Sequence, residues 1–181
     1  MNASNIDAAL RIAAIAHKDQ VRKEGDVPYI VHPVMVALML ATRGFSDEVV
    51  AAALVHDVLE DTDFPEDELR KELGDEVHAI VCSVTHDDTL SWEDKKRAYI
   101  ESVRAGSDGV KAVSTADKIH NMQSLLKAYS AQGPELWKAF NASKEQKLWF
   151  EEAMLAMLKE SWNDPMVGEY EALVAQMREL M

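Results

Sequence analysis

Apolar residues recur at helical spacing along almost the whole chain. Near the N-terminus, Ile6, Leu10 and Ala13 lie three or four residues apart, which places their side chains on one face of a helix. Ser4 and Asn5 precede most of this run and are candidate N-cap residues. No segment shows the alternation of apolar and polar residues that is typical of a half-buried strand. The pattern therefore predicts an all-α protein of about eight to ten helices.

Capping residues, glycines and prolines divide this pattern into separate helices. Residues 20–33 contain Gly25, Pro28 and Pro33 and predict a loop. Pro33 suits the first turn of the next helix, which is expected to end near Gly44. Five further helices are expected before residue 133, in this order: one from Ser46 through 53–63, one from Pro65 to Gly74, one over 75–85, one over 92–104 after Ser91, and one over about 108–130 between Gly106 and Gly133. Two or three more helices are expected after residue 133.

The segment ALVHDVLEDTD, residues 53–63, carries one imidazole and four carboxylates directly after an apolar run. On a helix, side chains three and four positions apart are neighbours, so His56 lies beside Glu60. By the same spacing, Asp57 lies beside Glu60 and Asp61. Burying such close carboxylates without a partner is costly. A bound cation would relieve the repulsion, and the alternative is a helix end at the surface, where the acids are hydrated.

Two further segments add potential metal ligands. His32 in IVHP and Asp117 in VSTADKIHNM are polar residues in largely apolar surroundings. Taken alone, His32 could be a hydrogen-bonded structural residue, and Asp117 could pair with Lys118 or face solvent. Together with His56 and Asp57 they form a set of two imidazoles and two carboxylates, which suits a divalent ion such as Mn²⁺, Fe²⁺ or Zn²⁺. Free coordination positions on such an ion can hold water and lower its pKa.

A second His-Asp dipeptide, His86-Asp87, falls where a helix gives way to a polar loop, and no acidic pair follows it at helical spacing. We interpret it as a loop feature without a role in the site. The single cysteine, Cys82, lies in the apolar run HAIVCSVT and is expected to be a small buried side chain. One cysteine cannot form an internal disulfide, so nothing points to an oxidising compartment.

The formal net charge is −13, which argues against general binding to nucleic acids or anionic membranes. An anionic small substrate is compatible with this charge if basic side chains gather in one pocket. The basic clusters are Arg22-Lys23, Lys95-Lys96-Arg97 and Lys118. The N-terminus lacks the features of a signal peptide, and no apolar stretch has the length of a membrane span, so we expect a cytoplasmic protein. The Met- and Trp-rich C-terminal helices could form a homo-oligomer interface, although core packing is the simpler interpretation.

Three segments, QVRKEGDVPYIVHPVMVA, AALVHDVLEDTD and ADKIHNM, resemble the HD-domain hydrolases of the Rel/Spo type and look most similar to the stand-alone small alarmone hydrolases. The matching segments run from about 16 to 126 in the family's order and spacing. The length of 181 residues predicts a single domain over residues 1–181, with the C-terminal helices, about 134–181, packed on its core. The resemblance implies an all-α HD fold. It also implies one Mn²⁺ ion, held by four ligands: His32, His56, Asp57 and Asp117.

The same resemblance implies hydrolysis of the 3′-pyrophosphate of guanosine tetra- or pentaphosphate, which releases pyrophosphate and GDP or GTP. Glu60 and Asp61 match the family's catalytic acidic pair, which positions or activates the attacking water. Arg22 and Lys23 match a basic pair near the nucleotide, with Arg22 placed to stack on guanine. Asn121 matches a contact to the nucleotide.

Two positions depart from the family's pattern. Ser114-Thr115 stand where the family often has Lys-Leu, and Gln123 stands where it often has Arg. Loss of that cation would weaken or redirect phosphate binding, so two alternatives stay open. One is the same hydrolytic machinery acting on another phosphorylated nucleotide, such as the 2′-phosphate of NADPH. The other is a nucleotide-sensing or interaction domain without turnover.

Overall fold

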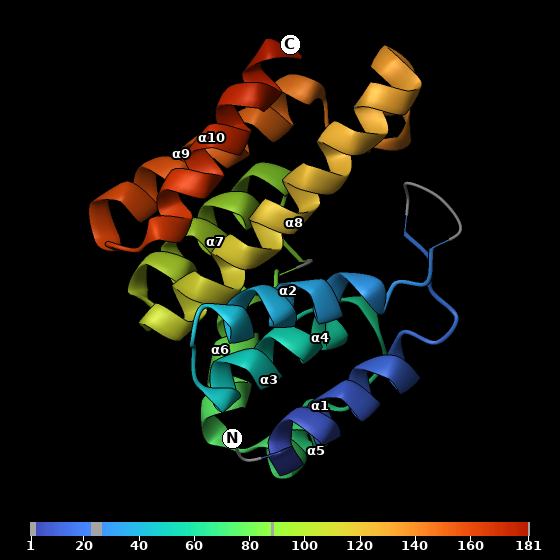
Figure 1. The fold of residues 1–181 in the computed structure, drawn as a ribbon, viewed down its shortest axis with the longest axis vertical. Coiled ribbons are helices and arrows are strands. Elements are labelled where there is room, and N and C mark those ends of the chain that lie inside the picture. The colour runs from blue at the N-terminus through green and yellow to red at the C-terminus, as the bar shows by residue number, and fades with distance from the viewer. Residues whose placement is uncertain (1–2, 23–26, 88, 181) are drawn as a thin grey trace.

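The computed structural model describes residues 3–22, 27–87 and 89–180. The all-α prediction is confirmed, since these residues form ten α-helices, one 3₁₀ helix and no strand (Figure 1). In chain order the helices are α1 (Ala3–Ala16), α2 (Val31–Thr42), α3 (Asp47–Val55), α4 (Val58–Asp61), α5 (Glu66–Leu73), α6 (Asp75–Val84), α7 (Trp92–Ala105), α8 (Asp108–Gln132), the 3₁₀ helix η1 (Gly133–Ala139), α9 (Lys144–Ser161) and α10 (Pro165–Glu179).

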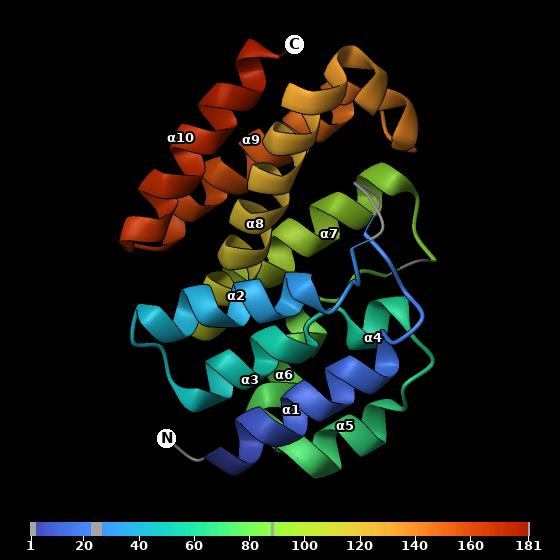
Figure 2. The same ribbon diagram turned by 45° about the vertical axis from the view of Figure 1, so that its right-hand side comes forward.

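The helices form two groups that the long helix α8 joins (Figure 1, Figure 2). Helices α1 to α6 make up one end of the molecule, and α7, α9 and α10 lie toward the other. Helix α8 contacts α2, α3 and α6 in the first group and α7, η1 and α10 in the second. Helix α3 packs against α1, α2 and α6, and its residues 49–55 are all buried. A polar residue at the end of α3 or in the middle of α8 therefore points into the protein interior.

Local capping signals set most of the helix ends. The Ser46 hydroxyl accepts a hydrogen bond from the backbone N of Val49 at the start of α3. The Ser91 hydroxyl does the same for the backbone N of Asp94 at the start of α7. Gly44, after α2, has a φ of 81°, a left-handed conformation that glycine adopts without steric cost. The helix boundaries expected at Gly44, Ser46 and Ser91 are confirmed.

The segment from Ser46 through 53–63 is not one helix, contrary to expectation. Helix α3 ends at Val55 and α4 begins at Val58, with His56 and Asp57 between them. Asp57 has φ −94° and ψ −4°, a backbone conformation displaced from ideal helix geometry. On a regular helix, consecutive side chains point about 100° apart. The interruption brings the Nε2 of His56 within 3.2 Å of the Oδ2 of Asp57.

Two smaller expectations are also corrected. Helix α1 begins at Ala3, so Ser4 and Asn5 lie within the helix and not before it. Cys82 is exposed, although its neighbours in the sequence are apolar. The reason is that α6 turns one face toward the protein interior, and Cys82 lies outside that face, which is formed by Val77, Ile80, Val81 and Val84.

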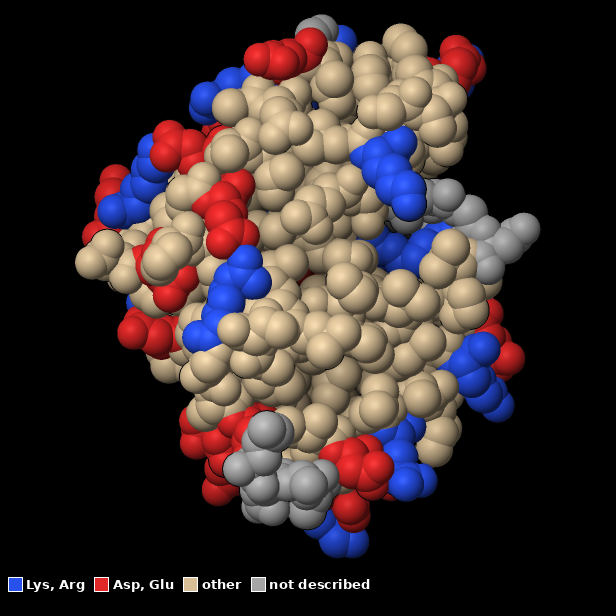
Figure 3. Space-filling model, viewed as in Figure 1, with Lys and Arg blue, Asp and Glu red and all other residues tan. Residues whose placement is uncertain are grey.

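The surface mixes charged and apolar regions. In Figure 3, charged side chains gather along the edges of the view, and uncharged residues cover much of its middle. Val31, Met35 and Leu38 are exposed apolar residues of α2. Among the helices of the described ranges, none combines the length and the apolar character that crossing a membrane requires.

Candidate active site

Two histidines and two aspartates from three parts of the fold converge beside the junction of α3 and α4. His32 is near the start of α2, His56 and Asp57 form the junction, and Asp117 lies in the middle of α8. The Nε2 of His32 is 3.5 Å from Asp57 Oδ2 and 3.0 Å from Asp117 Oδ1. The Nε2 of His56 is 3.2 Å from Asp57 Oδ2 and 3.6 Å from Asp117 Oδ1. The four residues that the sequence singled out as a ligand set thus lie together.

The donor atoms of this cluster fit a divalent metal ion. The Nδ1 of His56 donates to the carbonyl oxygen of Ala53 at 2.8 Å, so the neutral ring carries its lone pair on Nε2. This Nε2 is buried and has no hydrogen-bond partner among the described residues. Burial disfavours the charged ring, but the carboxylates of Asp57 and Asp117 outweigh it and raise the pKa of His56 to about 9. The cluster therefore favours positive charge at this nitrogen, which a bound cation supplies.

Asp117 is held in place by several partners. Its Oδ1 accepts a hydrogen bond from Asn121 Nδ2 at 2.5 Å, and its Oδ2 accepts one from Lys118 Nζ at 2.8 Å. Burial alone would raise the pKa of this carboxyl. The Lys118 ammonium and the imidazoles of His32 and His56 outweigh burial and hold the pKa of Asp117 well below its usual range. Asp117 is therefore ionised at neutral pH, as a metal ligand must be.

Glu60 and Asp61, the expected catalytic pair, lie next to each other on α4 in different surroundings. The Oε2 of Glu60 accepts hydrogen bonds from the Nδ1 and the backbone N of His86 at 2.8 Å and 3.1 Å. Burial raises the pKa of Glu60, but these bonds outweigh it, and the net result is a lowered pKa. The pKa of Asp61 is raised, first by burial and then by the charges of Asp57 and Glu60. The two carboxyls thus differ in proton affinity, as the members of acid–base pairs do.

Tyr29 connects the acidic pair to the ligand cluster. Its hydroxyl lies 2.6 Å from Asp57 Oδ2 and 3.1 Å from Asp61 Oδ2 and donates to these oxygens. Burial, followed by the charge of Asp57, raises the pKa of the Tyr29 phenol. The phenol therefore keeps its proton and fixes the orientation of both carboxylates.

A pocket of about 500 Å³ opens in front of these groups. This volume falls within the range of small-molecule sites, about 300–1,000 Å³. Its lining includes Asp57, Glu60, Asp61 and Asp117 together with five basic residues: Arg22, Lys95, Lys96, Lys118 and Lys147. Cations thus gather here although the whole chain has a net charge of −13. A pocket of this kind can hold an anionic ligand directly beside a bound metal ion.

Lys96 belongs to the basic part of this lining. Its Nζ lies 2.9 Å from the Nε2 of His86, whose ring stacks on Tyr99 with the ring centres 4.4 Å apart. Burial, followed by the charge of Lys118, lowers the pKa of Lys96 to about 8. Lys96 and Glu60 therefore approach opposite sides of the same imidazole.

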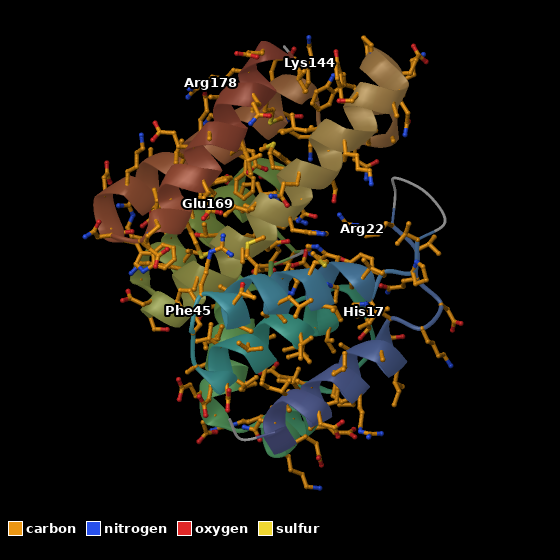
Figure 4. The ribbon with its side chains drawn as sticks, in the orientation of Figure 1. His17, Arg22, Phe45, Lys144, Glu169 and Arg178 are labelled. Atoms are coloured by element: carbon orange, nitrogen blue, oxygen red, sulfur yellow. The ribbon has the colours of Figure 1, made fainter. Side chains whose placement is uncertain are left out.

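Arg22 reaches from the loop before α2 toward α8 (Figure 4). Its Nη2 donates to Asn121 Oδ1 at 2.9 Å, and its guanidinium carbon is 5.6 Å from the centre of the Tyr29 ring. Both Arg22 and Asn121 line the pocket, so two of the three expected substrate contacts are neighbours there. The third, Lys23, lies outside the described residues.

Four residues of this site were not singled out from the sequence as members of it: Tyr29, His86, Lys96 and His120. His86 does lie in the loop after α6, but the interpretation that it has no part in the site was wrong, because it donates hydrogen bonds to Glu60 and lines the pocket. Its neighbour Asp87 is exposed and accepts a hydrogen bond from Thr89. The only sequence signal for Lys96 was its basic cluster. The contact between His120 and His32 joins residues far apart in the chain, and local spacing does not encode such contacts.

A family model for the HD domain matches residues 9–145 of the chain. The human protein guanosine-3′,5′-bis(diphosphate) 3′-pyrophosphohydrolase MESH1 is 39% identical over 138 residues, which are 75% of this chain and 75% of that protein. Guanosine-3′,5′-bis(diphosphate) 3′-pyrophosphohydrolase of Haemophilus influenzae is 40% identical over 120 residues, which are 63% of this chain. These residues span only 18% of the Haemophilus protein.

Two solved structures share the fold. One, from Listeria monocytogenes, has a TM-score of 0.76 and 36% identity and covers 82% of this chain and 99% of that one. The other is a metazoan ortholog of SpoT, described as hydrolysing ppGpp. It has a TM-score of 0.83 and 28% identity and covers 98% of this chain and 97% of that one.

Proposed function

The chain belongs to the HD-domain family, and on this basis we propose that it hydrolyses the 3′-pyrophosphate of guanosine tetra- or pentaphosphate to pyrophosphate and GDP or GTP. The observation that carries the proposal is one pocket whose lining combines three of the four proposed metal ligands, an acidic pair and five basic side chains. The names of the human and Haemophilus relatives support the choice of substrate.

The proposed metal ligands are His32, His56, Asp57 and Asp117, and the proposed ion is Mn²⁺. Two nitrogen and two oxygen donors suit Mn²⁺ and leave coordination positions for other partners. When bound, such an ion lowers the pKa of water and neutralises phosphate charge. The protein holds the four donor side chains close together. Asn121 and Lys118 fix the orientation of the Asp117 carboxylate, and Tyr29 fixes that of Asp57.

We assign Glu60 and Asp61 to the attacking water. The water oxygen adds to the phosphorus that is bonded to the ribose 3′ oxygen. The bond between this phosphorus and the ribose 3′ oxygen then breaks, and the ribose oxygen takes up a proton. Asp61, whose pKa is raised by burial and by the charges of Asp57 and Glu60, accepts the proton of the water. Glu60 stays ionised through its bonds to His86 and positions the water.

The substrate's phosphates face the basic residues of the pocket. The ammonium groups of Lys96, Lys118 and Lys147 line the pocket and are proposed to bind phosphate oxygens. Arg22, beside the Tyr29 ring, is proposed to stack on the guanine, and Asn121 to contact the ribose or a phosphate. Lys23 remains a proposed contact on the basis of the sequence alone.

Residues 1–181 are proposed to form a single functional domain. Helix α9 supplies Lys147, Phe150 and Glu151 to the same pocket that three of the four proposed metal ligands line. Helix α10 packs on α8 and α9. Removal of the C-terminal helices is therefore expected to open the pocket and not merely to shorten the protein.

The test is a panel of nucleotides assayed with and without Mn²⁺. Pyrophosphate release from guanosine tetra- or pentaphosphate that requires the ion is the expected result. If NADPH is the only nucleotide that is hydrolysed, with release of phosphate, the substrate is NADPH and not the guanosine phosphates. Gln123, which stands where the family often has Arg, is compatible with that outcome. Metal binding without turnover of any nucleotide would favour a sensing domain. An Asp63→Ala variant, changed at an exposed acid beyond α4, serves as the matched control for Asp57→Ala.

A further inference from the structure

A second group of potential metal ligands lies on helices α5 and α6. Glu66 is the first residue of α5, and His78 and Cys82 are four residues apart on α6, so their side chains share one face. The Oε1 of Glu66 is 2.8 Å from His78 Nε2 and 3.7 Å from Cys82 Sγ. Cys82 Sγ is 3.3 Å from His78 Nε2. None of these three residues lines the pocket, so the group is separate from the active site.

The spacing of the three donor atoms resembles that of ligands around a tetrahedral ion. Zinc–ligand distances are about 2.0–2.2 Å for nitrogen and oxygen and about 2.3 Å for sulfur. At the tetrahedral angle, these lengths separate two ligand atoms by roughly 3.3–3.6 Å. The observed separations of 2.8, 3.3 and 3.7 Å differ from these values by about half an ångström or less. Small side-chain rotations are therefore enough to admit an ion.

The packing of α5 on α6 holds these three side chains together, and the group is accessible to solvent. Helix α5 packs directly against α6, with Gly74 as the turn between them. The Glu66 side chain is 63% exposed and the His78 side chain is 18% exposed, so a fourth coordination position faces solvent. Further acids, Asp67 and Glu76, lie in the first turns of the same helices and add negative potential.

The three side chains are joined to one another by hydrogen bonds. The Cys82 thiol and the His78 ring both point hydrogen-bonding atoms at the Glu66 carboxylate. Burial, followed by the charge of Glu66, raises the pKa of the Cys82 thiol. The carboxylate thus faces a neutral thiol and an imidazole, with no Lys or Arg bridging the three atoms in the described contacts.

We propose that Glu66, His78 and Cys82 form a second metal site, which binds a zinc-type divalent ion through one oxygen, one nitrogen and one sulfur atom. On binding, the thiol of Cys82 releases its proton to the buffer, and the thiolate and the Nε2 lone pair of His78 coordinate the ion. A thiolate donor selects Zn²⁺ over Mn²⁺, whereas the nitrogen and oxygen donors of the active site suit Mn²⁺. The bound ion ties the start of α5 to α6.

The difference in donors allows a direct test. The full chain is loaded with Mn²⁺ and titrated with Co²⁺, a spectroscopic substitute for Zn²⁺. Cys82 is the single cysteine of the chain, so a thiolate-to-cobalt charge-transfer band reports on this site alone. The expected result is one further equivalent of Co²⁺ with this band, which Zn²⁺ then abolishes by displacement. A chain that binds no second equivalent, or binds it without the band, overturns the proposal.

Neighbouring acids provide matched variants. Glu66→Gln is expected to weaken Co²⁺ binding by about tenfold or more, and Asp67→Asn, which removes the same charge one residue away, is expected to change it by less than about twofold. His78→Gln should behave like Glu66→Gln. Circular dichroism and nucleotide hydrolysis check that each variant is folded. Equal losses in Glu66→Gln and Asp67→Asn would mean that the ion responds only to surface charge, and the site would be rejected.

Discussion

The Nδ1 of His32 lies 2.7 Å from the Nδ1 of His120. Nε2 of His32 is the atom proposed to bind the metal ion, so with an ion bound the ring proton would lie on Nδ1 and would be donated to His120. His120 therefore fixes the tautomer and the orientation of a proposed metal ligand. Such outer partners of a ligand tune metal affinity without touching the metal.

His120→Ala should lower the affinity for Mn²⁺ by about 10- to 100-fold, because His32 loses the acceptor that fixes its ring. The affinity is measured by titration against a competing chelator, with circular dichroism as a check on the fold. His120→Gln keeps an acceptor oxygen and should retain more of the affinity. An unchanged affinity in His120→Ala would remove this residue from the site.

Substitutions of Asp57 and Glu60 should have different effects on metal binding and on the rate of hydrolysis. Asp57→Ala is expected to abolish metal binding and hydrolysis together, since it removes a proposed ligand. Glu60→Gln should keep the metal and lower kcat by about 10²- to 10⁴-fold, because it removes the carboxylate that is proposed to position the water. Metal content and kcat are measured on the same preparations. Full metal occupancy in Asp57→Ala would show the ligand assignment to be wrong.

Arg22→Ala should raise KM by roughly 2- to 30-fold, which corresponds to a stacking contribution of about 0.5–2 kcal/mol. The effect should be larger on KM than on kcat, because Arg22 is proposed to stack on the base, away from the reacting phosphorus. Arg11→Ala is a suitable control, since Arg11 is exposed on α1 and pairs with Asp7. Stacking on guanine is refuted if KM stays the same in Arg22→Ala.

The pH profile should report on Lys96, whose pKa is lowered to about 8. Below this pH, Lys96 is charged and attracts phosphate, and above it the charge is lost. We therefore expect kcat/KM, which follows the free enzyme, to fall as the pH rises past about 8. In Lys96→Arg, whose side chain stays charged, the fall should move to higher pH. A profile identical in both proteins would exclude Lys96 as the titrating group.

Gly109 should be sensitive to substitution because α8 approaches α3 and α6 closely there. A Cβ at this position would lie 2.9 Å from Val49 Cγ2 and 3.2 Å from Ile80 Cδ1. Gly109→Ala is expected to lower the free energy of unfolding by about 1–3 kcal/mol. Gly168→Ala, in α10, meets no atom within 4 Å and should raise it by about 0.5–1 kcal/mol. Urea denaturation measures both, and a neutral Gly109→Ala would show that the packing can relax.

Helix ends were predictable because the signals that set them are local. Ser46 and Ser91 cap the backbone three residues ahead, and Gly44 and Gly74 adopt a positive φ that few other residues tolerate. The convergence of the ligand set followed from the family resemblance, since no local rule brings α2 and α8 together. Local signals therefore predicted where the helices begin and end, and the family resemblance predicted which of them come together at the site.

The features that the sequence did not reveal depend on tertiary contacts. The interruption at His56 and Asp57 is not marked by a glycine or a proline: His56 keeps helical backbone values and only Asp57 departs from them, so nothing in the spacing predicts it. His86 meets Glu60 across the pocket, and its partner could not be identified from its polar neighbours. Cys82 looked buried because its neighbours are apolar, although its own position on α6 faces outward.

The proposed ligands come from α2, from the α3–α4 junction and from α8, three parts of the fold that are far apart along the chain. An ion held by all three would close two long loops of the polypeptide, and the unfolded chain could not bind it in the same way. Its binding free energy would therefore add to the free energy of folding. The supply of divalent ions in the cell would then govern how long each copy of the protein survives proteolysis, as well as how fast it turns over substrate.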